Sequence, residues 1–309
     1  MRYVNSLFLA LVIIPFVHVR AADNPNDNKQ KSFATESEAF AALIEGMEKN
    51  SDEQLLDVLG HDNKDLVVQS DKEASARARE RVSKLAKEHL KIERIDDKAT
   101  ACFGYKCWPF PIPLVKGAEG WKFDTAAGKE EILNRRVGRD ELKAIQFMDA
   151  YADAQRIYAS ADHTGDKVMK FAQKLVSSKG KKDGLYWPVP EGSKDTTSPL
   201  AVLFEEGPDF FEGDGSIPYH GYYFKILTQQ GANVPNGKYN YVINGNMIAG
   251  FALVGWPADY GSSGIMTFVI NQQGIVYQKD LGADTAKLAA AMDEYNPDGT
   301  WKELKPEDK

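Results

Sequence analysis

The sequence is poor in the residues from which metal sites, disulfide scaffolds and membrane spans are built. Its 309 residues include two cysteines and five histidines, and the net charge is −7. After residue 21 there is no apolar run long enough to cross a bilayer, which takes about 20 residues. The sequence also has no stripe of basic residues with aromatic residues between them, the pattern typical of nucleic-acid binding. We therefore expect no membrane span after residue 21. We also expect no binding to nucleic acid, because an acidic surface repels phosphates.

The N-terminus has the layout of a secretory signal peptide. Arg2 precedes an apolar run from Leu7 to Val17, and Val19 and Ala21 stand at the −3 and −1 positions of a cut after Ala21. We assign residues 1–21 to the signal peptide and residues 22–34 to a polar, disordered lead. An uncleaved anchor is the alternative. The expected location is the periplasm or the cell exterior.

The two cysteines, Cys102 and Cys107, stand five positions apart around Gly104. Two nearby thiols of an exported protein usually pair, so we predict a disulfide. A zinc site would need two more ligands, and the nearest histidine, His89, is isolated. The spacing also differs from the Cys-x-x-Cys of redox proteins. We expect neither a metal nor a cofactor here.

Residues 35–137 read as an N-terminal α+β domain. Apolar residues recur at helical spacing, and Ser51 and Gly60 mark the start and end of a short helix. Strands are expected at 66–68, 92–95, 100–105 and 120–123, and helices at 40–47, 52–59, 73–90 and 125–136. Helices on a small sheet are similar to the cone-shaped folds of nuclear transport factor 2 and cystatin.

Residues 138–304 read as a second α+β domain, in which a long helix packs on an antiparallel β-meander. Gly138 is expected to end the preceding helix, and Asp140 to cap a helix over 141–160 with one apolar face. Asn244-Gly245 predicts a tight hairpin, because both residues tolerate positive φ. The nearly all-apolar run Phe251–Trp256 predicts a strand buried on both faces, and a last helix is expected over 285–295.

Two segments of this domain are candidate binding sites. Asp162, Thr164 and Asp166 place oxygen ligands at alternate positions, as in a calcium loop, but Lys167 stands where such loops have glycine. The competing interpretation is a turn, with Asp166 capping a helix over 168–175. The long irregular stretch 189–218 is a candidate partner surface. Its aromatic and acidic residues are Phe210, Phe211, Glu212 and Asp214.

His220 is the weak catalytic candidate, since it is the histidine beside the expected core sheet. The nearby Gly261-Ser262-Ser263-Gly264 is not the Gly-x-Ser-x-Gly elbow of a hydrolase, and a turn explains it better. A hydrogen-bonded residue at the start of a strand is the alternative interpretation of His220. Enzymatic activity stays undecided, and the pattern favours a non-catalytic role.

Several segments together resemble a bacterial exported family known as domain-of-unknown-function family 2950. They are GWKFDTAAGKEEILNRRVGRDELKAI, DGLYWP, YHGYYFKIL and GFALVGWPADYGSSGIMTFVINQQGIVYQKDLG. The resemblance spans residues 35 to Trp301 and implies no activity. The C-terminal half is also similar to the head domains of pilins and pseudopilins, without their apolar N-terminal helix or processing site.

Three functions are consistent with these patterns. The first is a non-catalytic envelope or secreted module that binds an envelope protein or polymer. The second is a hydrolase acting on envelope or extracellular polymer through His220. The third is a small-molecule carrier with a pocket in the N-terminal domain, near Trp108 and Trp121.

Overall fold

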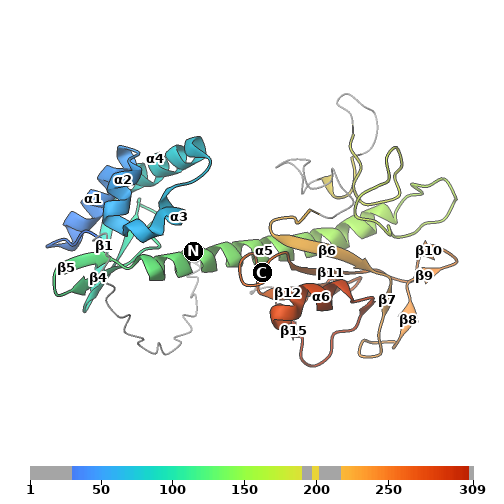
Figure 1. Ribbon diagram of the computed structural model, residues 1–309. Coiled ribbons are helices and arrows are strands. Elements are labelled where there is room, and N and C mark those ends of the chain that lie inside the picture. Colours follow the sequence, from blue (N-terminus) through green and yellow to red (C-terminus); the bar gives the residue numbers. More distant parts are fainter. Residues whose placement is uncertain (1–29, 190–196, 202–216, 306–309) are drawn as a thin grey trace, which may run out of the picture. The chain divides into compact units, whose positions relative to one another are not determined.

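The computed structural model describes residues 30–189, 197–201 and 217–305. The chain divides into two compact units, Met1–Gly128 and Lys129–Lys309, which we call the N-terminal and C-terminal units (Figure 1). Helices and mainly antiparallel sheets give the α+β class that the sequence predicts. The expected signal peptide, residues 1–21, lies outside the described residues.

The N-terminal unit begins with helices, and a side chain caps the start of three of them. The side chains of Thr35, Ser51 and Asp71 each accept a backbone N–H at the start of a helix, as their residue types favour. Residues 66–68, predicted as a strand, instead include the end of a short helix, because the chain continues from a 3₁₀ turn. The helices are α1 (Glu36–Glu48), α2 (Asp52–Leu59), η1 (His61–Asn63), α3 (Lys64–Val67) and α4 (Lys72–Glu88).

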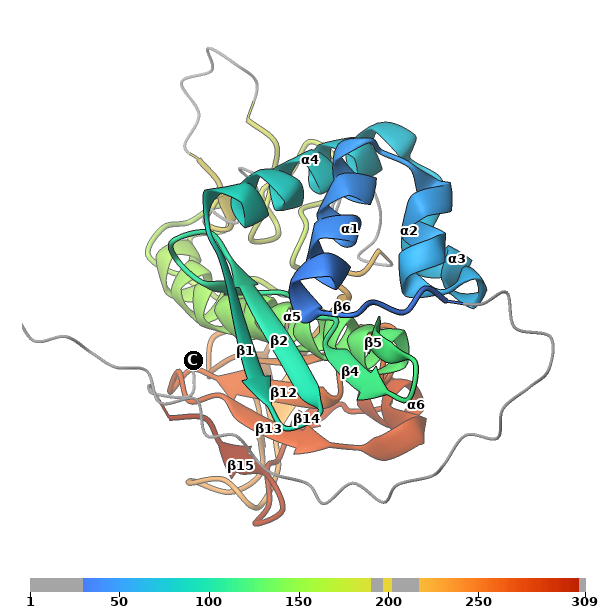
Figure 2. The same cartoon turned by 90° about the vertical axis from the view of Figure 1, so that its left-hand side faces the viewer.

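The N-terminal unit also contains an antiparallel sheet of order β1-β2-β4-β5, with β3 paired to β2. Its strands are β1 (Leu90–Ile95), β2 (Lys98–Phe103), β3 (Trp108–Pro109), β4 (Leu114–Gly117) and β5 (Gly120–Phe123). One face of the sheet packs against the helices (Figure 2). In this core the Phe40 ring lies edge-on to Phe103 and Phe123 at centroid distances of 6.2 and 5.4 Å. The other face presents charged residues, as is usual for an antiparallel sheet with one solvated side.

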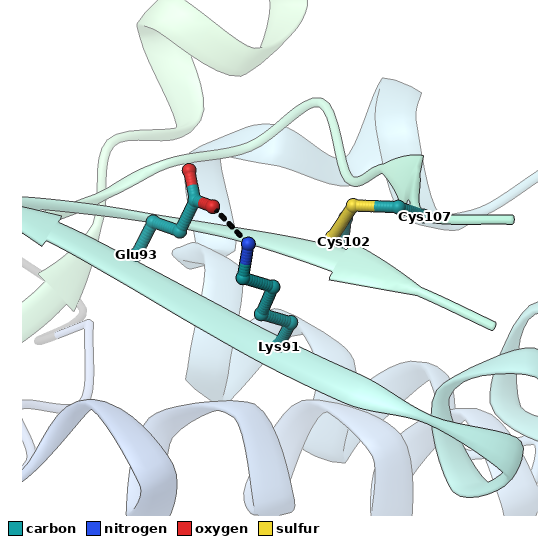
Figure 3. The surroundings of a disulfide bond; sticks show 4 residues. All are labelled: Lys91, Glu93, Cys102 and Cys107. Atoms are coloured by element: carbon teal, nitrogen blue, oxygen red, sulfur yellow. Dashed lines mark ion pairs between the residues drawn. A yellow bond between two sulfur atoms is a disulfide. The ribbon is translucent and has the colours of Figure 1, made fainter. Parts of the chain in front are cut away.

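The predicted disulfide joins Cys102 of β2 to Cys107 in the turn that follows. Gly104 and Cys107 have φ of 71° and 53°, and the backbone N–H of Cys107 donates to the Gly104 carbonyl at 2.9 Å. The bond lies beside an ion pair of β1, between Lys91 and Glu93 (Figure 3). The thiols therefore close a tight turn at the end of a β-strand, as predicted.

Helix α5 (Thr125–Tyr158) is continuous, so the prediction that Gly138 ends one helix and Asp140 caps the next is wrong. A glycine inside a helix costs only about 1 kcal/mol. Hydrogen bonds on both sides of Gly138 offset this cost. On the N-terminal side, the Arg136 Nε donates to the Ser262 carbonyl at 3.1 Å. The Glu141 carboxylate accepts the backbone N–H groups of Ile265 and Met266 at 2.9 and 3.0 Å. The expected domain boundary at 137/138 thus falls inside α5, whereas the compact units divide after Gly128.

The C-terminal unit contains a five-stranded antiparallel sheet of order β15-β13-β12-β11-β6, and α5 packs on it. The Phe147 ring stacks on Phe224 at 4.0 Å, and the Tyr151 hydroxyl donates to the Ala252 carbonyl at 3.1 Å. Leu142 and Ile157 of the predicted apolar face are about half exposed, at 47% and 56%. The strands are β6 (Tyr222–Leu227), β11 (Ala252–Pro257), β12 (Met266–Asn271), β13 (Tyr277–Asp280) and β15 (Lys302–Glu303).

Smaller elements of the C-terminal unit form two separate sheets. The hairpin β9 (Val242–Ile243) and β10 (Asn246–Met247) turns at Asn244 and Gly245, whose φ of 50° and 81° confirm the prediction. A three-stranded sheet joins β7 (Gln229–Gln230), β8 (Tyr239–Asn240) and β14 (Glu294–Tyr295). Helix α6 (Thr285–Ala290), after η4 (Gly282–Asp284), is shorter than predicted because residues 294–295 pair with β7.

The segment predicted as a helix over 168–175 contains no helix. Its backbone instead pairs with distant partners: the N–H of Phe171 donates to the Met247 carbonyl at 2.8 Å. Farther along, Asp183 accepts hydrogen bonds from the Lys174 ammonium at 2.8 Å and from the Ser178 backbone at 2.7 Å. Burial raises the pKa of Asp183, but these hydrogen bonds outweigh it and lower the pKa to about 2.

Candidate functional site

A cavity of about 500 Å³ opens on the C-terminal unit. Small-molecule sites commonly measure about 300–1,000 Å³. The walls come from segments distant in sequence. They are β7, the residue before β8, one residue of β12, the chain from the end of α6 to just after β14, and the residue before β15. We call it the β7–β14 cavity. The residues that line it include Gln229, Lys238, Met292, Asp293, Glu294, Asn296 and Trp301.

Two consecutive glutamines of β7 have opposite roles, because neighbouring side chains of a strand point to opposite faces. Gln230 is buried. Its amide donates to the carbonyls of Pro235 and Gly237 at 2.9 and 2.8 Å and accepts from the Tyr241 hydroxyl at 3.2 Å. Gln229 lines the cavity, and within the described part of the chain its side-chain amide has no hydrogen bond. It is available to a ligand.

Gly231 allows the wall of the cavity to close. A Cβ at this position would lie 2.2 Å from the Asn296 Cγ, so any larger residue would collide with that side chain. The Asn296 Oδ1 accepts the backbone N–H of Asn233 at 2.9 Å, and the Gly231 N–H donates to the Tyr295 carbonyl at 3.0 Å. This close approach fixes Asn296 and the β14 strand in the wall.

The charges at the cavity are paired. The Lys238 ammonium lies 3.0 Å from the Glu294 carboxylate, and the Lys225 ammonium lies 3.2 Å from the Asp293 carboxylate. Lys225 also donates, at 2.8 Å in each case, to the carbonyls of Ala290, the last residue of α6, and of Met292 just after it. A cation is favourable there because helix C-termini carry partial negative charge. Each acid of the cavity therefore has a basic partner.

Trp301 forms an aromatic part of the wall. The turn before it is held by Asp298, whose carboxylate accepts the Thr300 hydroxyl and, at 2.9 Å, the Thr300 backbone N–H. Those hydrogen bonds lower the pKa of Asp298. The Trp301 ring packs in part against the core, and its indole N–H makes no hydrogen bond to a described residue. The Trp301 side chain thus gives the cavity an apolar surface.

His220, the weak catalytic candidate, lies just before β6. It has a φ of 44°, and its ring contacts Tyr219 at a centroid distance of 4.4 Å. A Cβ on the next residue, Gly221, would lie 2.8 Å from the Ser263 Cβ, so the structure brings this corner to the Gly-Ser-Ser-Gly turn. The Ser263 hydroxyl accepts the Asp259 N–H at 3.0 Å and donates to the Asp259 carbonyl at 3.2 Å. That hydroxyl holds the turn.

The oxygens of Asp162 and Asp166, the weak calcium candidates, already have partners. Asp162 accepts the backbone N–H groups of Thr164, Gly165 and Lys167, at 2.7 to 3.0 Å. Asp166 accepts the Val168 N–H and the Lys170 ammonium. In the described ranges, no group of three or more His, Cys, Asp or Glu residues is close enough to hold a metal ion.

His163 is a residue that sequence reasoning missed. Its ring stacks on Tyr158 at 4.5 Å and lies 5.4 Å from the Trp187 ring. Burial, with a contribution from the Lys182 charge, lowers its pKa. Its Nε2 is buried and finds no partner among the described residues. The contact with Trp187 could not be predicted from the residues around His163, because Trp187 is distant in the chain.

The predicted partner surface stays a prediction, and the N-terminal cavity lies elsewhere than expected. Phe210, Phe211, Glu212 and Asp214, the predicted partner surface, lie outside the described residues. The N-terminal unit has a cavity of about 540 Å³ lined by charged residues of α1 and α4, among them Glu48, Lys84 and Lys87, and not by Trp108 or Trp121. Among the described residues, no helix combines the length and apolarity needed to cross a membrane.

Comparison with known proteins gives one match. The family model described as "Protein of unknown function (DUF2950)" matches residues 30–304, which is most of the chain. No curated protein and no solved structure matches the sequence. The match carries no activity, so the function has to be argued from the site itself.

Proposed function

We propose that the chain, which belongs to the DUF2950 family of unknown function, is an exported, non-catalytic binding module. Its ligand site is the β7–β14 cavity. The observation that carries this proposal is the side-chain amide of Gln229, which lines a ligand-sized cavity and has no hydrogen bond within the described part of the chain. Gln229 is partly exposed, so water can satisfy its amide in the free protein, and a ligand with matching hydrogen-bonding groups can replace that water.

The geometry supports binding more than hydrolysis. Hydrolysis requires a nucleophile or an acid–base pair held at the substrate. The Ser263 hydroxyl is engaged in its own turn, and the acids of the cavity, Asp293 and Glu294, are paired with lysines. The cavity therefore offers recognition groups in place of an activated nucleophile.

Export is part of the proposal. The expected signal peptide over 1–21 supports it, as does the disulfide between Cys102 and Cys107, because such bonds persist in oxidising compartments. The proposed location is the periplasm or the cell exterior. The ligand would then be an envelope or extracellular compound.

Native mass spectrometry of the protein purified from its own host tests the proposal. We expect wild-type protein to carry an added mass that Gln229→Leu loses, because leucine keeps the volume but removes the amide. Gln273→Leu is the matched control, since Gln273 is an exposed glutamine outside the cavity lining.

The control should retain the added mass. A wild-type protein without any bound mass, or a mass that Gln229→Leu retains in full, would contradict the assignment of the cavity. A folded state for each variant is checked by its thermal transition, so that loss of the mass is not confused with loss of the structure.

A further inference from the structure

We infer that the ligand of the β7–β14 cavity is an uncharged saccharide. This inference rests on the proposed binding function and adds the chemical class of the ligand. Three features of the cavity support it, namely the balance of charge, the aromatic side chain of Trp301 and the side-chain amide of Gln229. Each selects against a different class of small molecule.

The charge balance favours a neutral ligand. Glu294 is paired with Lys238 at 3.0 Å, and Asp293 with Lys225 at 3.2 Å. A cationic ligand would have to displace a lysine from its carboxylate. An anionic ligand would in the same way have to displace the Glu294 carboxylate from Lys238, on a chain that already has a net charge of −7. A neutral ligand can accept and donate hydrogen bonds without breaking either ion pair.

Trp301 favours a ligand with an apolar face. A saccharide ring has C–H groups on its faces and hydroxyl groups around its rim. The C–H groups carry slight positive charge and pack well on the negative face of an aromatic ring. Met292 lies in the same wall and adds a flexible apolar contact. A fully polar ligand such as a small amide would leave this surface unused.

Gln229 favours a ligand with several hydroxyls. Its side chain has one acceptor oxygen and two donor hydrogens, and each hydroxyl of a saccharide both donates and accepts. A pair of adjacent hydroxyls can therefore satisfy both ends of the amide. The Asn296 side chain is held in place, because its Oδ1 accepts the Asn233 N–H and the side chain packs on Gly231. The part of the cavity wall that contains Asn296 is therefore ordered before a ligand binds.

The test compares three sugars of nearly equal shape and different charge. Saturation-transfer NMR is recorded with the full exported chain and glucose, glucosamine or glucuronate, and then with a glycan array of longer neutral and charged saccharides. We expect signal transfer to the ring C–H groups of neutral saccharides and at least tenfold weaker binding by Trp301→Ala, a change of about 1.4 kcal/mol in binding free energy. Trp256→Ala is the control for loss of a partly buried tryptophan outside the lining.

The outcomes separate this inference from the proposed function. Tighter binding of glucosamine or glucuronate than of glucose would overturn the uncharged class. So would a Gln229-dependent mass in the native spectrum that is not a saccharide, and the proposed binding function would then still stand. Absence of any bound mass and of any saccharide binding would overturn both.

Discussion

Replacing Gly231 with alanine tests the close approach that closes the wall of the β7–β14 cavity. Gly231 does not have positive φ, so alanine brings no backbone strain, and the effect is purely steric. The new Cβ would lie 2.2, 2.4 and 2.6 Å from the Cγ, Oδ1 and Cβ of Asn296. Asn296 must move, and the hydrogen bond from the Asn233 N–H to its Oδ1 is lost.

The magnitude follows from two costs. Overpacking costs about 1–3 kcal/mol, and a lost hydrogen bond costs about 0.5–1.5 kcal/mol, so we expect Gly231→Ala to destabilise the C-terminal unit by about 2–4 kcal/mol. For a unit of this size, the melting temperature should fall by about 5–15 °C. Differential scanning calorimetry measures this, because it resolves the transition of each unit that unfolds separately.

The matched control is Gly299→Ala. A Cβ on Gly299 has no atom within 4 Å, so its melting temperature should stay close to that of the wild type. Adding Asn296→Gly to the Gly231→Ala variant removes the side chain that collides and should recover part of the lost stability. Equal melting temperatures for Gly231→Ala and Gly299→Ala would refute the reasoning, since the predicted collision would then cost nothing.

Three further predictions concern the rest of the chain. Gly138→Ala should stabilise by up to about 1 kcal/mol in urea unfolding, because Gly138 lies inside a continuous helix with open space around it; destabilisation would argue for a break there. Glu141→Gln should destabilise by about 1–2 kcal/mol in the same assay, since the charged acceptor of two backbone N–H groups is weakened, and unchanged stability would contradict that role. Asp183 has a lowered folded pKa of about 2, so its contribution is complete above the unfolded value of about 3.9 and disappears as pH falls through 2. Asp183→Asn should therefore lose about 1–2 kcal/mol at pH 7 and show a flatter stability profile between about pH 4 and 2; parallel profiles would contradict the assignment.

Local rules anticipated much of the fold. Ser51 caps α2, Asn244 and Gly245 turn the β9–β10 hairpin, and the apolar run that starts at Phe251 is a buried central strand. In each case the deciding interaction lies within a few residues or within one apolar run. The disulfide was predictable for the same reason, because its cysteines are near neighbours in the sequence.

The failures have a common physical cause, which is that distant contacts override local preference. Gly138 signals a break, but α5 continues because residues beside it are bound by the turn before β12. The cavity was not predicted at all. Gln229 and Trp301 are far apart in the chain, and they meet because β7 pairs in parallel with β14 over only two residues. A bridge that short leaves no periodic pattern in the sequence.

The most direct test of the binding site is the indole N–H resonance of Trp301. In a ¹⁵N–¹H spectrum, each of the five tryptophans gives an indole N–H signal. The signal that is missing from the spectrum of the Trp301→Phe variant belongs to Trp301. On addition of envelope extract from the host, we expect the Trp301 signal to shift while those of Trp108 and Trp121 stay in place. A shift confined to Trp108 and Trp121, with Trp301 unmoved, would contradict the β7–β14 cavity as the ligand site and would favour a carrier pocket in the N-terminal unit.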